Sequence, residues 1–369
     1  MALGVWRARH RLLSLSLVIL LFLVQGFAQQ PDSAPPPGAP PQSGAPQDTN
    51  STQPVTSAPI RVQVNEVVVP VTVTDEKGKF VSNLDEKDFQ ILDQGQPQAI
   101  QFFTRERNQP VVVGFLIDLS NATRTQWKNF EQAAEDMVLQ MLPNNPKFSG
   151  YLIGYSNESE LMVNTTTDPE KILEKLRKLK PGGGAAFYDA IYQACTSRDL
   201  VQGEPVEPRR IIIVVGDGND NASKKTLDEV LELAQRNLVT IYGISTVSYG
   251  FTSPGDDNLV RLAEETGGKV EYPLQDVYKD VSGYQSVPSD EGNFALKVGT
   301  GGYAAAISNS IFRAIANIAG EITTQYILRY TPNSTDTPSL KRQFRTINIK
   351  VALGNVKVRA RKGYYPFAP

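Results

Sequence analysis

The chain has 369 residues, which is enough for one sizeable core and a smaller module at roughly 150 residues per domain. Its 37 basic and 39 acidic residues nearly balance, so the charge gives no footprint for nucleic-acid binding. The only histidine is His10, in a segment that we expect to be removed. A mature chain without histidine cannot use Ser-His-Asp or Cys-His catalysis and cannot bind zinc through imidazole. Any metal must therefore be bound by oxygen atoms.

The N-terminal segment, residues 1–28, has the pattern of a secretory signal peptide. Three arginines precede an apolar run from Leu12 to Val24, and small residues follow near Ala28. Because that run is shorter than the ~20 residues of a spanning helix, we expect cleavage near Ala28 rather than an uncleaved anchor. Residues 29–58 are rich in Pro, Ser and Gln and predict a disordered linker. The mature chain is therefore expected to be periplasmic or secreted.

The next segment, residues 59–105, alternates apolar and polar residues with a period of two and predicts a small β module. About 45 residues rarely form an independent core, so this module should pack on a neighbour. Residues 323–369 contain three further β-like runs with no helix after them. We therefore expect the two flanking segments to pair into one β-sandwich.

The central segment, residues 109–322, opens with an apolar run from Val111 that ends in Asp118 and Ser120. Such a run is typical of a strand buried on both faces of a parallel sheet. A second run, from Arg209, ends in Asp217 in the same way. Ligands of open α/β sheets bind beyond the carboxyl ends of the strands, so these carboxylates mark a candidate site. The alternative is that Asp118 caps the following helix and that Asp217 binds backbone amides.

Strand and helix patterns alternate through this central segment, which predicts a doubly wound, mostly parallel sheet with helices on both faces. Residues 274–303 are long, polar and glycine-containing, and we expect an insertion loop there. The glycines at 182–184 do not form a phosphate-binding loop, because no Gly-Lys-Ser/Thr sequence follows them.

Three motifs of the central segment together resemble a von Willebrand factor type A (vWA) domain, whose fold is Rossmann-like. They are Asp118-Leu119-Ser120, the loop from Gly183 into Phe187-Tyr188-Asp189-Ala190, and the Val-Val-Gly-Asp-Gly sequence ending at Gly218. The flanking sequences 88–95, 325–330 and 359–365 are similar to those of exported VWFA-related proteins described mainly from Acidobacteria. The resemblance covers residues 60–366.

The resemblance implies a metal-ion-dependent adhesion site, in which a carboxylate from a protein partner completes the coordination of Mg²⁺ or Mn²⁺. Asp118 and Ser120 match the first two positions of the Asp-x-Ser-x-Ser motif, and Asp217 matches the acidic residue of the third loop. Ala122 replaces the final serine and Ala185 replaces a threonine, so two neutral oxygen donors are missing. Two carboxylates, a hydroxyl and water would form the sparse coordination that Mg²⁺ tolerates.

The polar residues around these loops are expected to form a rim that contacts the partner: Asn121, Gly184, Asn219, Asp220 and Asn221. The leading hypothesis is an exported, non-enzymatic module that binds a protein partner through the carboxyl-end loops, with a degenerate metal site. The alternative is a metal-independent structural or scaffold protein of the cell envelope. An enzyme is disfavoured because no nucleophile with an adjacent base is in evidence.

Overall fold

The computed structural model describes residues 66–105, 109–197, 200, 208–247, 253–275, 290–333 and 343–366, and only the backbone of residues 290–304. The predicted signal peptide and linker, residues 1–28 and 29–58, lie outside these ranges. Across the described ranges, no helix combines the length and the apolar character needed to cross a membrane.

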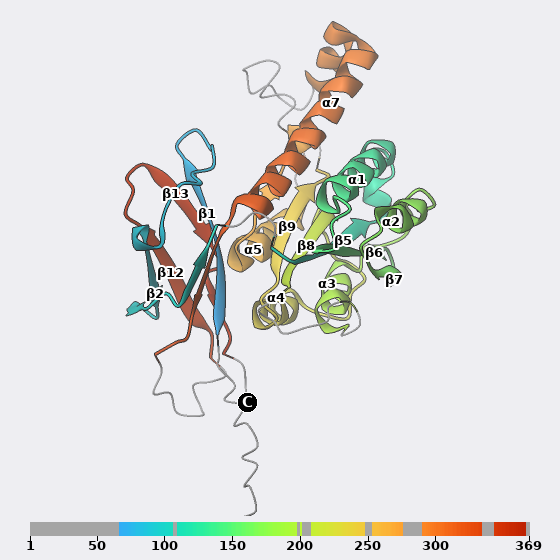
Figure 1. Cartoon of the computed structure of the whole chain (residues 1–369). Helices are drawn as coiled ribbons and strands as arrows, with labels where there is room; N and C mark the ends of the chain where they lie inside the picture. Colours follow the sequence, from blue (N-terminus) through green and yellow to red (C-terminus); the bar gives the residue numbers. More distant parts are fainter. Residues whose placement is uncertain are drawn as a thin grey trace, which may run out of the picture. The chain divides into compact units, whose positions relative to one another are not determined.

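The central segment forms a six-stranded sheet with the order β10-β9-β8-β5-β6-β7. Every neighbouring pair is parallel except β6 and β7, which are antiparallel. The prediction of a doubly wound, mostly parallel sheet is confirmed (Figure 1). The strands are β5 (Val111–Asp118), β6 (Phe148–Tyr155), β7 (Ser159–Thr166), β8 (Arg209–Gly216), β9 (Thr240–Ser245) and β10 (Val270–Glu271).

Helices cover both faces of this sheet, because successive side chains of each buried strand point to opposite faces. On β5, Val113 and Phe115 pack in the core beneath one helix layer, and Leu116 packs in the core beneath the other. The first layer contains α1 (Trp127–Met141), α2 (Pro169–Leu176) and α7 (Asp290–Thr324). The second contains α3 (Phe187–Thr196), α4 (Leu227–Arg236) and α5 (Asp256–Thr266).

The flanking segments form two antiparallel four-stranded sheets, with the orders β13-β1-β11-β4 and β14-β12-β2-β3. Val69, Ile91 and Ile349 come from different strands of the two sheets and share one buried core. The predicted β-sandwich is therefore confirmed. Its strands are β1 (Val67–Asp75), β2 (Phe89–Asp93), β3 (Gln96–Gln98), β4 (Phe102–Thr104), β11 (Tyr326–Tyr330), β12 (Arg345–Val351), β13 (Val356–Ala360) and β14 (Gly363–Tyr364).

The expected insertion loop at residues 274–303 is wrong in two places. Helix α7 begins at Asp290, so residues 290–303 are helical, and Leu274 is buried in the core of the parallel-sheet domain. Extending an existing helix costs far less than nucleating one, so the well-packed end of α7 can carry a glycine-containing beginning. Residues 276–289 lie outside the described ranges.

A buried carboxylate, Glu321 of α7, joins the sandwich to the parallel-sheet domain. Its Oε1 accepts hydrogen bonds from the hydroxyl of Thr72 on β1 at 3.0 Å and from that of Tyr242 on β9 at 3.1 Å. Its Oε2 is ion-paired with Arg359 of β13 and lies 3.6 Å from the ammonium of Lys269. One side chain therefore connects four elements that are far apart in the sequence.

Candidate functional site

The first loop of the candidate site leaves the carboxyl end of β5. Asp118 Oδ1 accepts a hydrogen bond from the backbone N–H of Ser120 at 2.7 Å. The hydroxyl of Thr123 donates to the carbonyl oxygens of Asp118 and Ser120 at 3.2 and 3.0 Å. The short helix η2 (Asn121–Thr123) follows, and α1 begins only at Trp127. Asp118 therefore holds its own loop and does not cap α1.

Asp118 is only 1% exposed, and its second carboxylate oxygen, Oδ2, has no hydrogen-bond partner within the described residues. Burial, together with the nearby charge of Asp217, raises the pKa of this carboxyl to about 7, although hydrogen bonds from Ser120 oppose the shift. Buried polar atoms almost always have a partner. An acceptor without one marks a position where a proton, a cation or a donor from another molecule would be stabilised.

The second loop follows β8 and carries Asp217. Its Oδ1 accepts a hydrogen bond from the backbone N–H of Asn219 at 3.0 Å, and its Oδ2 accepts one from the hydroxyl of Ser253 at 3.2 Å. The alternative to a metal site is that Asp217 binds backbone amides, and the bond from Asn219 is such an interaction. Each oxygen of Asp217 thus already has one protein donor, and Ser253 is a residue that the sequence did not single out.

Tyr155 is a second residue of the site that sequence reasoning missed. A Cβ added at Gly216 would lie 2.5 Å from the Tyr155 hydroxyl and 3.2 Å from Asp118 Oδ2, so both atoms approach the backbone of β8 at one point. The Tyr155 hydroxyl is buried without a partner in the described part of the chain, and burial raises its pKa, which keeps its proton in place. The register between β5 and β6 identifies Tyr155 as part of the site, because it pairs with Asp118 at the ends of these two parallel strands.

The glycine loop is held against both other loops. The backbone N–H of Asn121 donates to the carbonyl of Gly183 at 3.1 Å, and the N–H of Gly184 donates to Asn157 Oδ1 at 2.7 Å. Asn221 Oδ1 accepts from the N–H of Ala185 at 2.8 Å. The site is therefore three loops tied together by short polar contacts.

The predicted rim residues divide into two kinds. Asn121 is exposed, whereas Asp220 accepts hydrogen bonds from the backbone N–H of Tyr188 at 2.9 Å and from the hydroxyl of Ser223 at 2.5 Å. Asn221 is exposed but its side-chain oxygen is bonded to the glycine loop. Asp220 and Asn221 thus have a structural use, while Asn121 presents its side chain to solvent.

The residues present fit only a hard cation that keeps much of its water. Asp118, Ser120 and Asp217 offer oxygen atoms, and Asp118 Oδ2 is an acceptor that no group of the described residues satisfies. Ala122 and Ala185 offer none, and no group of three His, Cys, Asp or Glu side chains gathers anywhere in the described ranges. Mg²⁺ and Mn²⁺ accept oxygen ligands, and Mg²⁺ retains several waters in protein sites.

Comparison with known families supports the resemblance inferred from the motifs. Residues 113–219 match the sequence model of the von Willebrand factor type A domain, a range that includes Asp118, Ser120 and Asp217. Comparison with curated proteins finds no match.

Solved structures with a similar arrangement of elements have low sequence identity to this chain. One is a von Willebrand factor type A protein from Catenulispora acidiphila, with 11% identity over 73% of this chain and 70% of that chain and a TM-score of 0.40. A second is an aerotolerance-related membrane protein from Bacteroides fragilis, with 15% identity, coverage of 47% and 97%, and a TM-score of 0.37. A third is proximal thread matrix protein 1 from the mussel byssus with a zinc-occupied adhesion motif, with 14% identity, coverage of 62% and 49%, and a TM-score of 0.41.

Proposed function

Because the chain contains a von Willebrand factor type A domain, we propose that it is an exported, non-enzymatic interaction module of the VWFA-related type. In this proposal a protein partner binds the loops at the carboxyl ends of β5, β6 and β8. Domains of this family are generally interaction modules, and the loops sit where ligands of open α/β sheets bind. Export rests on the signal-peptide pattern of residues 1–28.

The observation that carries the proposal is the unpartnered Oδ2 of Asp118. A buried carboxylate oxygen without a donor costs free energy unless something outside the chain satisfies it. We propose that Asp118, with Ser120 and Asp217, holds Mg²⁺ or Mn²⁺ through direct and water-mediated contacts. Such a cation would supply an open coordination position for a carboxylate of the partner. The exposed side chain of Asn121 and the neighbouring loop backbone would contact the partner beside it.

The first test is metal-dependent stability of the purified mature chain. Titration with Mg²⁺ or Mn²⁺ after removal of metal with EDTA should raise the melting temperature in a saturable way, because a ligand of the native state stabilises it. Asp118→Asn should abolish this rise, whereas Asp257→Asn, at an exposed position of α5, should leave it unchanged. No rise at millimolar metal, or a rise that survives Asp118→Asn, would remove the metal from the proposal.

The second test concerns the partner. A photo-crosslinking side chain at Asn121 should capture one defined protein in the native envelope, and the same group at Gly354, in the turn before β13, should not. Capture that is lost on chelation supports a metal-dependent partner.

A metal-independent scaffold is the second candidate. It is favoured by Ala122 and Ala185 and by the protein donors that already bind both oxygens of Asp217. Capture at Asn121 that is insensitive to EDTA would favour this reading, and equal capture from both positions would contradict a site at these loops.

A further inference from the structure

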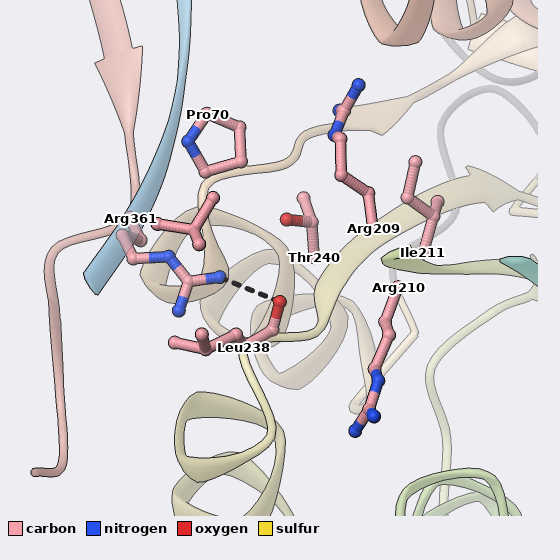
Figure 2. Close-up of a pocket in the computed structure, with 8 residues that line it drawn as sticks. Pro70, Arg209, Arg210, Ile211, Leu238, Thr240 and Arg361 are labelled. Carbon is pink, nitrogen blue, oxygen red and sulfur yellow. Dashed lines mark hydrogen bonds between the residues drawn. The ribbon is translucent and has the colours of Figure 1, made fainter. Parts of the chain in front are cut away.

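A second polar pocket lies at the opposite ends of the strands from the carboxyl-end loops. Arg209 and Thr240 begin β8 and β9, and they line a small, partly open cleft with Val68 and Pro70 of β1. Arg361, just after β13, completes it (Figure 2). The pocket therefore shares no residue with the candidate adhesion site and does not depend on the function proposed above.

Arg361 is the unusual group in this pocket. Its side chain is 2% exposed, and within the described ranges its guanidinium makes one hydrogen bond, from Nη2 to the carbonyl oxygen of Leu238 at 3.0 Å. Its Nε is buried without a partner, and no carboxylate of the described residues forms an ion pair with it. Burial lowers its pKa to about 10, so it remains charged at neutral pH. A buried charge without a counter-charge is strongly unfavourable.

Thr240 supplies a second donor on the same pocket. It is a buried residue, 3% exposed, and lines the pocket beside Leu238. Figure 2 shows its oxygen directed toward the side of the pocket on which Arg361 and Pro70 lie.

The other two arginines of the pocket direct their charges elsewhere. Their guanidinium groups point away from that of Arg361 (Figure 2). Arg209 donates to the carbonyl oxygen of Ile322 at 3.0 Å and to the side chain of Gln325. The guanidinium of Arg361, the hydroxyl of Thr240 and apolar walls therefore line one space, which the stems of Arg209 and Arg210 also line.

We propose that this pocket binds one small monovalent anion, of the class of chloride or formate, between Arg361 and Thr240. A single negative charge would balance the single guanidinium, whereas a dianion such as sulfate would leave an excess charge buried. The guanidinium is weakly hydrated and is suited to buried ion pairs. The walls come from β1 of the sandwich and from β8 and β9 of the parallel-sheet domain. The anion would therefore stabilise the contact between the sandwich and the parallel-sheet domain.

The test is the anion dependence of the melting temperature of the full mature chain, without added divalent metal. At equal ionic strength, chloride and formate should raise it in a saturable way relative to gluconate, which is too large for the pocket. The shift should reach roughly 5 °C at about 100 times the dissociation constant. Equal melting temperatures in chloride, formate and gluconate would overturn the proposal.

Two variants and one matched control locate the effect. Arg361→Met should abolish the difference between chloride and gluconate, and Lys362→Met, which removes a neighbouring exposed charge, should keep it. If Arg361→Met does not fold, Thr240→Val keeps the shape of the side chain and removes only the hydroxyl, and it should weaken chloride binding severalfold. An unchanged chloride response in Thr240→Val would contradict the site.

Diffraction gives a direct readout. A crystal grown in sodium bromide should show an anomalous peak within hydrogen-bond distance of Arg361 Nε and Thr240 Oγ1. A water molecule at that position, with bromide elsewhere, would mean that solvent alone satisfies Arg361 and would overturn the proposal.

Discussion

At the scale of single residues, Asp118 shows how position changes the chemistry of an ordinary carboxyl. It ends a fully buried strand, so it is removed from water, yet among the described residues only one of its two carboxylate oxygens has a hydrogen-bond donor. The cost of burying its charge appears as a pKa of about 7 in place of 3.8. The folded chain therefore holds the Asp118 proton at pH values where an ordinary aspartic acid has lost it.

This shift predicts a pH dependence of the metal-free protein. Between about pH 4 and 7 the folded state keeps the Asp118 proton that the unfolded chain releases, so the free energy of unfolding falls as pH rises through that window. The full loss is on the order of 4 kcal/mol. Urea denaturation with EDTA should give this slope as the difference between the wild type and Asp118→Asn.

The same measurement with saturating Mg²⁺ should flatten the slope, since a bound cation keeps the carboxylate ionised. Asp257→Asn is the matched control and should retain the wild-type slope. Parallel stability curves for the wild type and Asp118→Asn would contradict the proton assignment.

At the scale of elements, α7 connects the two domains through one carboxylate. Glu321 is fully buried, and its two oxygens bind hydroxyls of β1 and β9 and a guanidinium of β13. Each domain has its own apolar core, and a small buried cluster of Val68, Leu238 and Ile327 bridges the two. The polar contacts of Glu321 supply directional bonds at this junction.

Glu321→Gln should therefore destabilise the protein by about 2–4 kcal/mol in urea denaturation. The amide nitrogen would replace an acceptor and leave Arg359 without its counter-charge. Glu264→Gln, which breaks an exposed pair with Lys362, should cost less than ~1 kcal/mol. Equal effects of the two substitutions would show that the Glu321 network contributes no more than a surface pair.

At the scale of the whole molecule, the sandwich is built from both ends of the folded chain. Strand β1 lies between β11 and β13, and β2 lies between β12 and β3. The parallel-sheet domain is thus an insertion between strands that pair with one another. Neither flanking segment has a complete set of neighbours without the other.

Cutting the chain after Ile322 should therefore expose residues 66–105 to proteolysis, because β1 loses both neighbouring strands and its core partners Tyr326 and Leu328. Limited proteolysis with mass spectrometry should detect cleavage in this range at protease levels that leave the full mature chain intact. Unchanged protection of these residues would contradict an interdependent sandwich.

Much of this architecture was predictable from local patterns. Apolar runs such as 111–117 and 211–215 have one favourable environment, a strand buried on both faces, and the carboxylate after each run marks the strand end. The capping box of Thr226 and Glu229 is likewise recognisable from two residue types three positions apart, and it is present at the start of α4. The beginning of α7 was wrongly expected to be a loop, because its glycines and polar residues have low helix propensity. It is helical because a helix extends easily from a well-packed end.

By itself the sequence determined the order of strands and helices, the two carboxylates at the strand ends and the missing oxygens at Ala122 and Ala185, because these depend on residue type and spacing. Only the tertiary structure decided which polar atoms lack partners. Tyr155, Glu321 and Arg361 became informative only when register and domain packing placed them away from water, since the cost of burying a polar group depends on every residue around it.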